Sequence, residues 1–187
     1  PIPKFRYYML QDYVYLYDYA KVFALGVVKA ADYDLMRFFS DFVYSTLNGE
    51  MKIHKSYMKR LGVTDDEVRA VKMALPNISY THYMLTIGYN EDVLAILVSI
   101  LACAWSYQII GEKLAEIPGA SEHEFYGEWI CGYSSEEYAA GNDQLINMID
   151  KLGENISEDT AAHLIEIFIN CSLYEEGFWD MAYKMGK

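Results

Sequence analysis

The longest apolar stretch of the chain runs from Asn90 to Leu114 and is hydrophobic on every side for about five turns, at ~3.6 residues per turn. A helix of this kind is either a membrane span or the central helix of a bundle. Its interior carries the polar residues Ser99, Ser106 and Gln108, its flanks are acidic, and no basic cluster marks a cytoplasmic side. The pattern favours a buried central helix, with Asn90 as its N-cap.

The remaining chain also shows helical periodicity, with short connections and no strand-like alternation longer than a few residues. Helices are predicted over residues 4–28, 32–61 with a possible kink at Asn48-Gly49, a short segment after the Thr64–Glu67 capping box, 77–89, 90–114, 121–131, a segment ending near Leu152, and 158–183. No linker, internal repeat or low-complexity tract interrupts them. The sequence therefore predicts an all-α, single-domain helical bundle over residues 1–187.

The composition of the chain indicates which kinds of molecule it can bind. The chain has 187 residues, of which 53% are hydrophobic and 22% charged, enough for one domain with a substantial core. Its formal net charge of −12 argues against a nucleic-acid partner, because phosphate binding needs a basic surface. Eighteen tyrosines are many for this length. Since tyrosine joins an apolar ring to a polar tip, they favour a pocket for a planar, hydrogen-bonding small molecule.

The three cysteines, Cys103, Cys131 and Cys171, form no CxxC pair. An odd number without such spacing argues against a disulfide framework and a zinc site, and predicts a reducing, cytoplasmic compartment. Cys131 and Cys171 are predicted to be small core residues. Cys103 shares a face of the central helix with Tyr107, one turn later, and is the candidate functional centre.

Two charged residues stand in unusual surroundings. Asp12 lies between Tyr8 and Tyr15, and burying a carboxylate costs free energy unless it is paired. It is therefore a candidate ligand-binding group, with exposure to solvent as the alternative. The pair Glu50 and His54 has i, i+4 spacing, which alone is weak evidence for a metal site, and His54 is predicted to be exposed.

No familiar catalytic signature is complete. None of the four histidines has a local motif that pairs it with Cys103, so a papain-like arrangement is weakly supported. Paired Glu-x-x-His motifs and a glycine-rich phosphate loop do not occur. What remains is one cysteine, the embedded acids Asp12 and Glu175, and tyrosines. That set suits nucleophilic attack on a polarised planar ring, with carboxylates moving the protons.

Five segments together carry a resemblance. They are KFRYYMLQDYVYLYDYAK (Lys4–Lys21), SYTHYM (Ser79–Met84), LACAWSYQIIGEKL (Leu101–Leu114), FYGEWICGY (Phe125–Tyr133) and YEEGFWDMAY (Tyr174–Tyr183). In this order and at these intervals they resemble the TenA family of thiaminase II and aminopyrimidine aminohydrolases, over nearly the whole chain. The resemblance implies a heme-oxygenase-like all-α fold, a homotetramer, and no metal or cofactor. It also implies a family helix ahead of Lys4 that the given sequence does not contain.

The resemblance also implies a reaction: hydrolysis of the bond between a pyrimidine's exocyclic methylene and its leaving group. The product is 4-amino-5-hydroxymethyl-2-methylpyrimidine, from an aminomethylpyrimidine or, less productively, from thiamin. Cys103 matches the family nucleophile, Glu175 its acid/base and Asp12 the carboxylate that binds the aminopyrimidine, through a fork of two hydrogen bonds. The residues that match the pocket tyrosines are Tyr15, Tyr80, Tyr107 and Tyr133. The neighbouring Glu176, about 100° further around the helix, is expected at the surface.

Two other readings remain open. The chain could be a non-catalytic pyrimidine-binding or regulatory relative, although a pure binder has no need of Cys103, Glu175 and Asp12 together. It could also be a heme- or metal-dependent oxidase on the same fold, although the sequence offers no obvious ligand set. Turnover of an aminopyrimidine separates the first from the hydrolase, and an absorbance spectrum separates the second.

Overall fold

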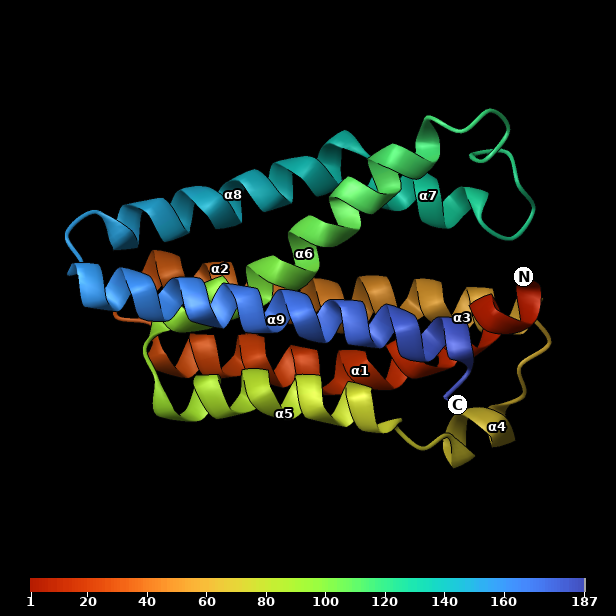
Figure 1. Cartoon of the computed structure of the whole chain (residues 1–187), viewed down its shortest axis with the longest axis horizontal. Coiled ribbons are helices and arrows are strands. Elements are labelled where there is room, and N and C mark those ends of the chain that lie inside the picture. Colours follow the sequence, from red (N-terminus) through yellow and green to blue (C-terminus); the bar gives the residue numbers. More distant parts are fainter. Residues whose placement is uncertain (187) are drawn as a thin grey trace. The chain divides into compact units, whose positions relative to one another are not determined.

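The computed structural model describes residues 1–186, and every regular element in that part of the chain is a helix (Figure 1). The all-α prediction is confirmed. The elements are α1 (Ile2–Lys29), α2 (Tyr33–Ser45), the π-helix η1 (Thr46–Glu50), α3 (Met51–Arg60), α4 (Asp65–Ala70), α5 (Leu75–Asn90), α6 (Val93–Ala115), α7 (Gly127–Tyr133), α8 (Glu136–Gly153) and α9 (Glu158–Lys184). They divide into two compact units: residues 1–96 with the chain from Leu173 onward, and residues 97–172.

The first unit is built on α1, which packs against α2, α3 and α5. Figure 1 shows α1 and α5 lying side by side. Buried side chains occur on several sides of α1, including Met9, Leu16 and Val22. At Gly26 an added Cβ would lie 2.3 Å from the ring of Phe39, so α2 can approach α1 closely only because this residue has no side chain. Asp12 is among the buried residues of this helix.

The predicted helix over residues 32–61 forms with a break at the expected place. A π turn, η1, includes Asn48-Gly49 and separates α2 from α3. Gly62 follows α3 with a φ of +68°, the left-handed conformation that glycine adopts without strain. Both hydrogen bonds of the predicted capping box between Thr64 and Glu67 are present at the start of α4. These local signals were read correctly.

The second unit contains most of α6, all of α7 and α8, and α9 as far as Ser172. The predicted N-cap of the central helix was wrong by two residues. Asn90 ends α5, where its side chain donates to the carbonyl of Thr86. Asp92 is the residue that caps α6, because its carboxylate accepts the Ala95 N–H at 3.0 Å.

Helix α6 is long and apolar enough to cross a membrane by length and composition. Its most apolar 18-residue window has a mean hydropathy of 2.1, and 61% of that window is buried within the fold. The core helix of a soluble protein passes the same test, and one such helix is weak evidence for a span. The extent of burial is what a central helix requires.

The helix predicted over residues 121–131 forms only in its second half. The imidazole Nδ1 of His123 accepts the backbone N–H groups of Phe125 and Tyr126, at 3.1 and 3.3 Å, which gives the backbone an alternative to helix. Helix α7 therefore begins at Gly127. Cys131 is exposed, so its predicted place in the core was wrong, whereas Cys171 is buried as expected.

Candidate active site

Asp12 lies buried within α1, held by two hydrogen bonds. The hydroxyl of Tyr8, one turn earlier, donates to Oδ2 at 3.1 Å, and Nε2 of His54 on α3 lies 2.6 Å from the same oxygen. Each of these three residues is only 3% exposed. Asp12 is therefore embedded, as the surrounding tyrosines indicated, but the prediction of an exposed His54 was wrong.

The contacts of His54 determine where its protons lie. Nδ1 is 3.0 Å from the Glu50 carbonyl oxygen, which can only accept, so Nδ1 carries a hydrogen. Nε2 faces a carboxylate, and a contact of 2.6 Å between two acceptors would be repulsive without a proton between them. Burial lowers the pKa of His54, but the hydrogen bond and charge of Asp12, with Glu50, outweigh it and raise that pKa from 6.5 to about 8. At neutral pH the pair is an imidazolium and a carboxylate.

The π turn explains why His54 faces α1. In an uninterrupted α-helix, His54 would lie about 80° around the axis from the buried Thr46, since eight residues turn it through ~800°. The wide turn of η1 accommodates one extra residue, which reduces this offset to about 20°. His54 thus falls on the buried side, with Met51 and Met58. The charged residues around His54 in the sequence had indicated the exposed side instead.

We expect the pH dependence of stability to report this pair. A folded-state pKa of about 8, against 6.5 when unfolded, means that His54 stabilises the fold fully below pH 6.5 and loses this contribution as pH rises through 8. The loss should be about 2 kcal/mol of unfolding free energy, measured by urea unfolding between pH 6 and 9. His82→Gln, at an exposed histidine, should leave the decline unchanged. A flat profile in the wild type would refute the charged pair.

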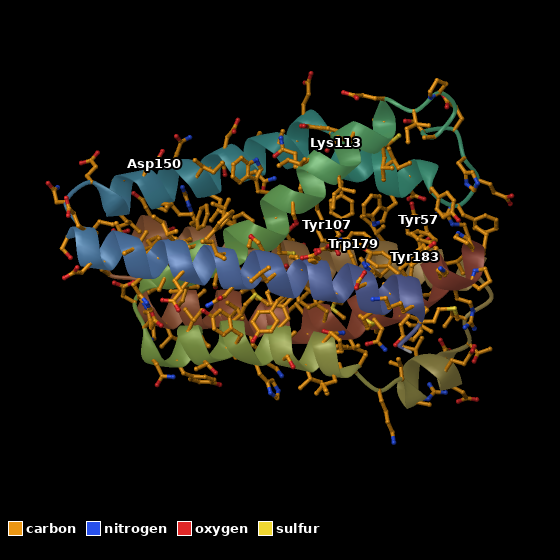
Figure 2. All side chains as sticks on the ribbon, in the orientation of Figure 1. Tyr57, Tyr107, Lys113, Asp150, Trp179 and Tyr183 are labelled. Atoms are coloured by element: carbon orange, nitrogen blue, oxygen red, sulfur yellow. The ribbon has the colours of Figure 1, made fainter. Side chains whose placement is uncertain are left out.

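A connected set of aromatic rings in the first unit includes Tyr8, the tyrosine that donates to Asp12. The ring of Tyr8 stacks on Trp179 of α9, labelled in Figure 2, with centroids 5.1 Å apart and planes 7° apart. Phe178 contacts both Tyr8 and Tyr15, at 6.2 and 5.8 Å. Tyr15 in turn lies 5.6 Å from Tyr80 of α5. The predicted site residues Tyr15 and Tyr80 therefore belong to one aromatic cluster, and Asp12 is joined to it through the hydroxyl of Tyr8.

Glu175 belongs to the same unit, on the C-terminal part of α9. It is 5% exposed and precedes Phe178 and Trp179 by three and four residues, so these side chains share a helix face. Its neighbour Glu176 is exposed, as predicted. The sequence therefore offers two adjacent carboxylates of which only one is buried, and Glu175 is the candidate for proton transfer.

Cys103, Tyr107 and Tyr133 belong to the second unit. Cys103 and Tyr107, one turn apart on α6, are 8% and 4% exposed, so their predicted common face is buried. The ring of Tyr107 lies 4.8 Å from that of Tyr133 at the end of α7, and Trp129 contacts both, at 5.9 and 4.6 Å. The Ser106 hydroxyl donates to the Cys103 carbonyl at 2.9 Å. The thiol thus lies on a helix face bordered by packed aromatic rings.

Gly111 permits the approach of α7 to α6. A Cβ at this position would lie 2.8 Å from both the backbone carbon and the Cβ of Tyr133. We expect Gly111→Ala to displace Tyr133 and to lower the unfolding free energy by about 1–3 kcal/mol, the usual cost of overpacking, in thermal or urea unfolding. Gly141→Ala, within α8, meets no atom within 4 Å and should instead be neutral or stabilising. Equal effects of the two substitutions would contradict this reading.

Four of the seven predicted site residues therefore lie in the first unit and three in the second. Sequence reasoning missed His54 and gave Tyr8 no role, although both hold Asp12. A usable signal was present: a buried carboxylate needs a partner, and a kink at Asn48-Gly49 changes the face on which His54 lies. Among residues 1–186, no three His, Cys, Asp or Glu side chains form a group that could hold a metal ion.

Comparison with known sequences shows a likeness over nearly the whole chain. The sequence model of the TENA/THI-4/PQQC family matches residues 1–185, across both units. The aminopyrimidine aminohydrolase of Helicobacter pylori is 48% identical over 181 residues, covering 97% of this chain and 83% of that protein. The protein of the same name from Halalkalibacterium halodurans is 46% identical over 180 residues, covering 96% of this chain and 80% of its own.

Solved structures agree with the fold. A TenA homologue from P. horikoshii superposes with a TM-score of 0.88 at 30% identity, covering all of this chain and 85% of that one. A protein from Silicibacter sp. described as a TenA family transcription regulator also gives 0.88, at 28% identity, covering 97% and 82%. The match to the family model, the relatives aligned over nearly the whole chain and the shared fold agree. This chain belongs to the TENA/THI-4/PQQC family.

Proposed function

We propose that this protein is an aminopyrimidine aminohydrolase of thiamin-pyrimidine salvage. It converts 4-amino-5-aminomethyl-2-methylpyrimidine and water to 4-amino-5-hydroxymethyl-2-methylpyrimidine and ammonia, and accepts thiamin as a second substrate. The observation that carries the proposal is the name shared by two relatives at 48% and 46% identity over nearly the whole chain. The buried carboxylate of Asp12, joined to a cluster of aromatic rings through the hydroxyl of Tyr8, supports it.

The roles in the first unit follow from polarity and shape. Asp12 accepts hydrogen bonds from the aminopyrimidine, because a carboxylate is a strong acceptor for the N–H groups of such a ring. Tyr15 and Tyr80 offer ring faces and hydroxyl groups that orient a planar substrate. Glu175 transfers protons: it protonates the departing amine and then takes a proton from the attacking water.

Cys103 is the proposed nucleophile. Its thiolate adds to a carbon of the pyrimidine ring, a C–S bond forms, and the ring loses its aromaticity. The electrons then expel the amine from the exocyclic methylene. Water adds to that methylene, and the C–S bond breaks as the ring becomes aromatic again. Tyr107 and Tyr133, whose rings pack together beside the thiol's helix face, are proposed to line the pocket.

We further propose that residues 1–187 act as one domain and that the protein is a cytoplasmic homotetramer. An exposed aliphatic stripe supports self-association: Ile165, Ile169 and Leu173, at successive turns of α9, are 60%, 51% and 59% exposed. The absence of CxxC spacing among three cysteines supports a reducing compartment. Light scattering on the purified protein measures the oligomer directly.

A regulatory role is the second candidate, favoured by the description of the Silicibacter relative as a transcription regulator. The formal net charge of −12 argues against direct contact with nucleic acid. Ammonia release from 4-amino-5-aminomethyl-2-methylpyrimidine decides between the two. Steady-state turnover supports the hydrolase, whereas binding of the pyrimidine without any turnover would favour a regulator.

A further inference from the structure

The described hydrogen bonds to Asp12 fall on only one of its two carboxylate oxygens. Both of its hydrogen bonds, from Tyr8 and His54, fall on Oδ2. A carboxylate oxygen offers two in-plane lone pairs, so two donors occupy Oδ2 fully. No described residue between positions 1 and 186 donates to Oδ1. A two-oxygen fork with a ligand would require one of these buried bonds to break, whereas a contact through Oδ1 alone would break neither.

We propose that His54 is the positioning residue of the pyrimidine site: in its imidazolium form it fixes Oδ2 of Asp12 and leaves Oδ1 as the oxygen that binds the aminopyrimidine. This inference rests on the proposed function, in that Asp12 is the group that binds the ring. It adds a residue, a protonation state and a single contact oxygen to that site.

The geometry makes the positioning depend on protonation. The Glu50 carbonyl keeps one hydrogen on Nδ1 in either state of the ring. Loss of a proton therefore occurs at Nε2, which then presents a lone pair to Oδ2 at 2.6 Å. Two acceptors at that distance repel, so the Asp12 side chain must turn away or helices α1 and α3 must separate. Neutral His54 thus releases the carboxylate that imidazolium holds.

Few ionisable groups face His54. Helix α3 packs against α1 and η1 within the first unit. From α1 these groups are Asp12 and the hydroxyl of Tyr8, and from η1 Glu50, whose charge and carbonyl both favour the protonated ring. Because these partners raise the pKa of His54 to about 8, the release falls in an accessible pH range.

The test is binding of the product pyrimidine, 4-amino-5-hydroxymethyl-2-methylpyrimidine, by calorimetry from pH 6 to 9.5, which needs no turnover. For the wild type we expect affinity to be constant below pH 7.5 and to fall about tenfold per pH unit above 8. His54→Gln keeps an N–H donor that does not titrate, so its affinity should lose this decline. Tyr8→Phe removes the other donor, and its decline should persist.

A second measurement follows the protonation of His54 directly in the wild-type protein. Carbon-13 labelling of the histidine rings should show one resonance that titrates near pH 8 in the free protein. With bound pyrimidine, the midpoint of this titration should move to higher pH. A wild-type affinity that does not change through pH 8, or a decline that persists in His54→Gln, overturns the inference. Absence of binding at every pH overturns the proposed function instead, so the two failures are distinguishable.

Discussion

Cys103→Ala is expected to lower kcat for 4-amino-5-aminomethyl-2-methylpyrimidine by at least ~10³-fold, the order expected when a covalent nucleophile is removed. The substitution removes only the sulfur from a buried helix face, so the aromatic rings that border it keep their contacts. KM should change far less than kcat, because Cys103 is proposed to act in the chemical step and not in binding the ring. Steady-state kinetics of ammonia release measure both constants.

The other two cysteines give matched controls. Cys131→Ala, at an exposed thiol, should keep wild-type kcat, and Cys171→Ala tests a second buried thiol on a different helix. Cys103→Ser distinguishes the chemistry from the volume, because the hydroxyl is a much weaker nucleophile at neutral pH. Full activity in Cys103→Ala would keep the hydrolase but transfer the chemistry to Glu175 and water.

The features that sequence predicted well are those encoded within a few residues. The capping box at Thr64 and Glu67 and the left-handed Gly62 formed as read, because both depend on local backbone chemistry. The buried face shared by Cys103 and Tyr107 followed from their one-turn spacing. These inferences needed no knowledge of which helices pack together.

The features that sequence missed depend on contacts between distant segments. His54 was placed at the surface because its charged neighbours suggested a solvated helix, and only the π turn brings it to Asp12, 42 residues earlier. The helix expected from residue 121 was shortened by hydrogen bonds to the His123 ring, which no periodicity records. The sequence indicated that a buried Asp12 needs a partner, but it did not identify His54 as that partner.

Glu175→Gln is expected to lower kcat for the aminomethylpyrimidine by about 10²–10⁴-fold, the usual contribution of a general acid and base. Glutamine has nearly the shape of glutamate, so the packing of α9 should be retained while proton transfer is lost. The adjacent Glu176→Gln supplies the matched control: it changes the same charge on an exposed side chain and should leave kcat unaltered. Equal losses in the two variants would point to an effect of net charge.

The leaving group makes this prediction sharper. An amine must be protonated to depart, whereas the thiazolium of thiamin departs as a neutral ring and needs no proton. If Glu175 is the general acid, Glu175→Gln should therefore lose more activity with the aminomethylpyrimidine than with thiamin, in parallel measurements of kcat. Its second role, taking a proton from water, applies to both substrates and sets the loss that they share. Losses of the same size with both would confine Glu175 to water activation and leave the protonation of the amine to another group.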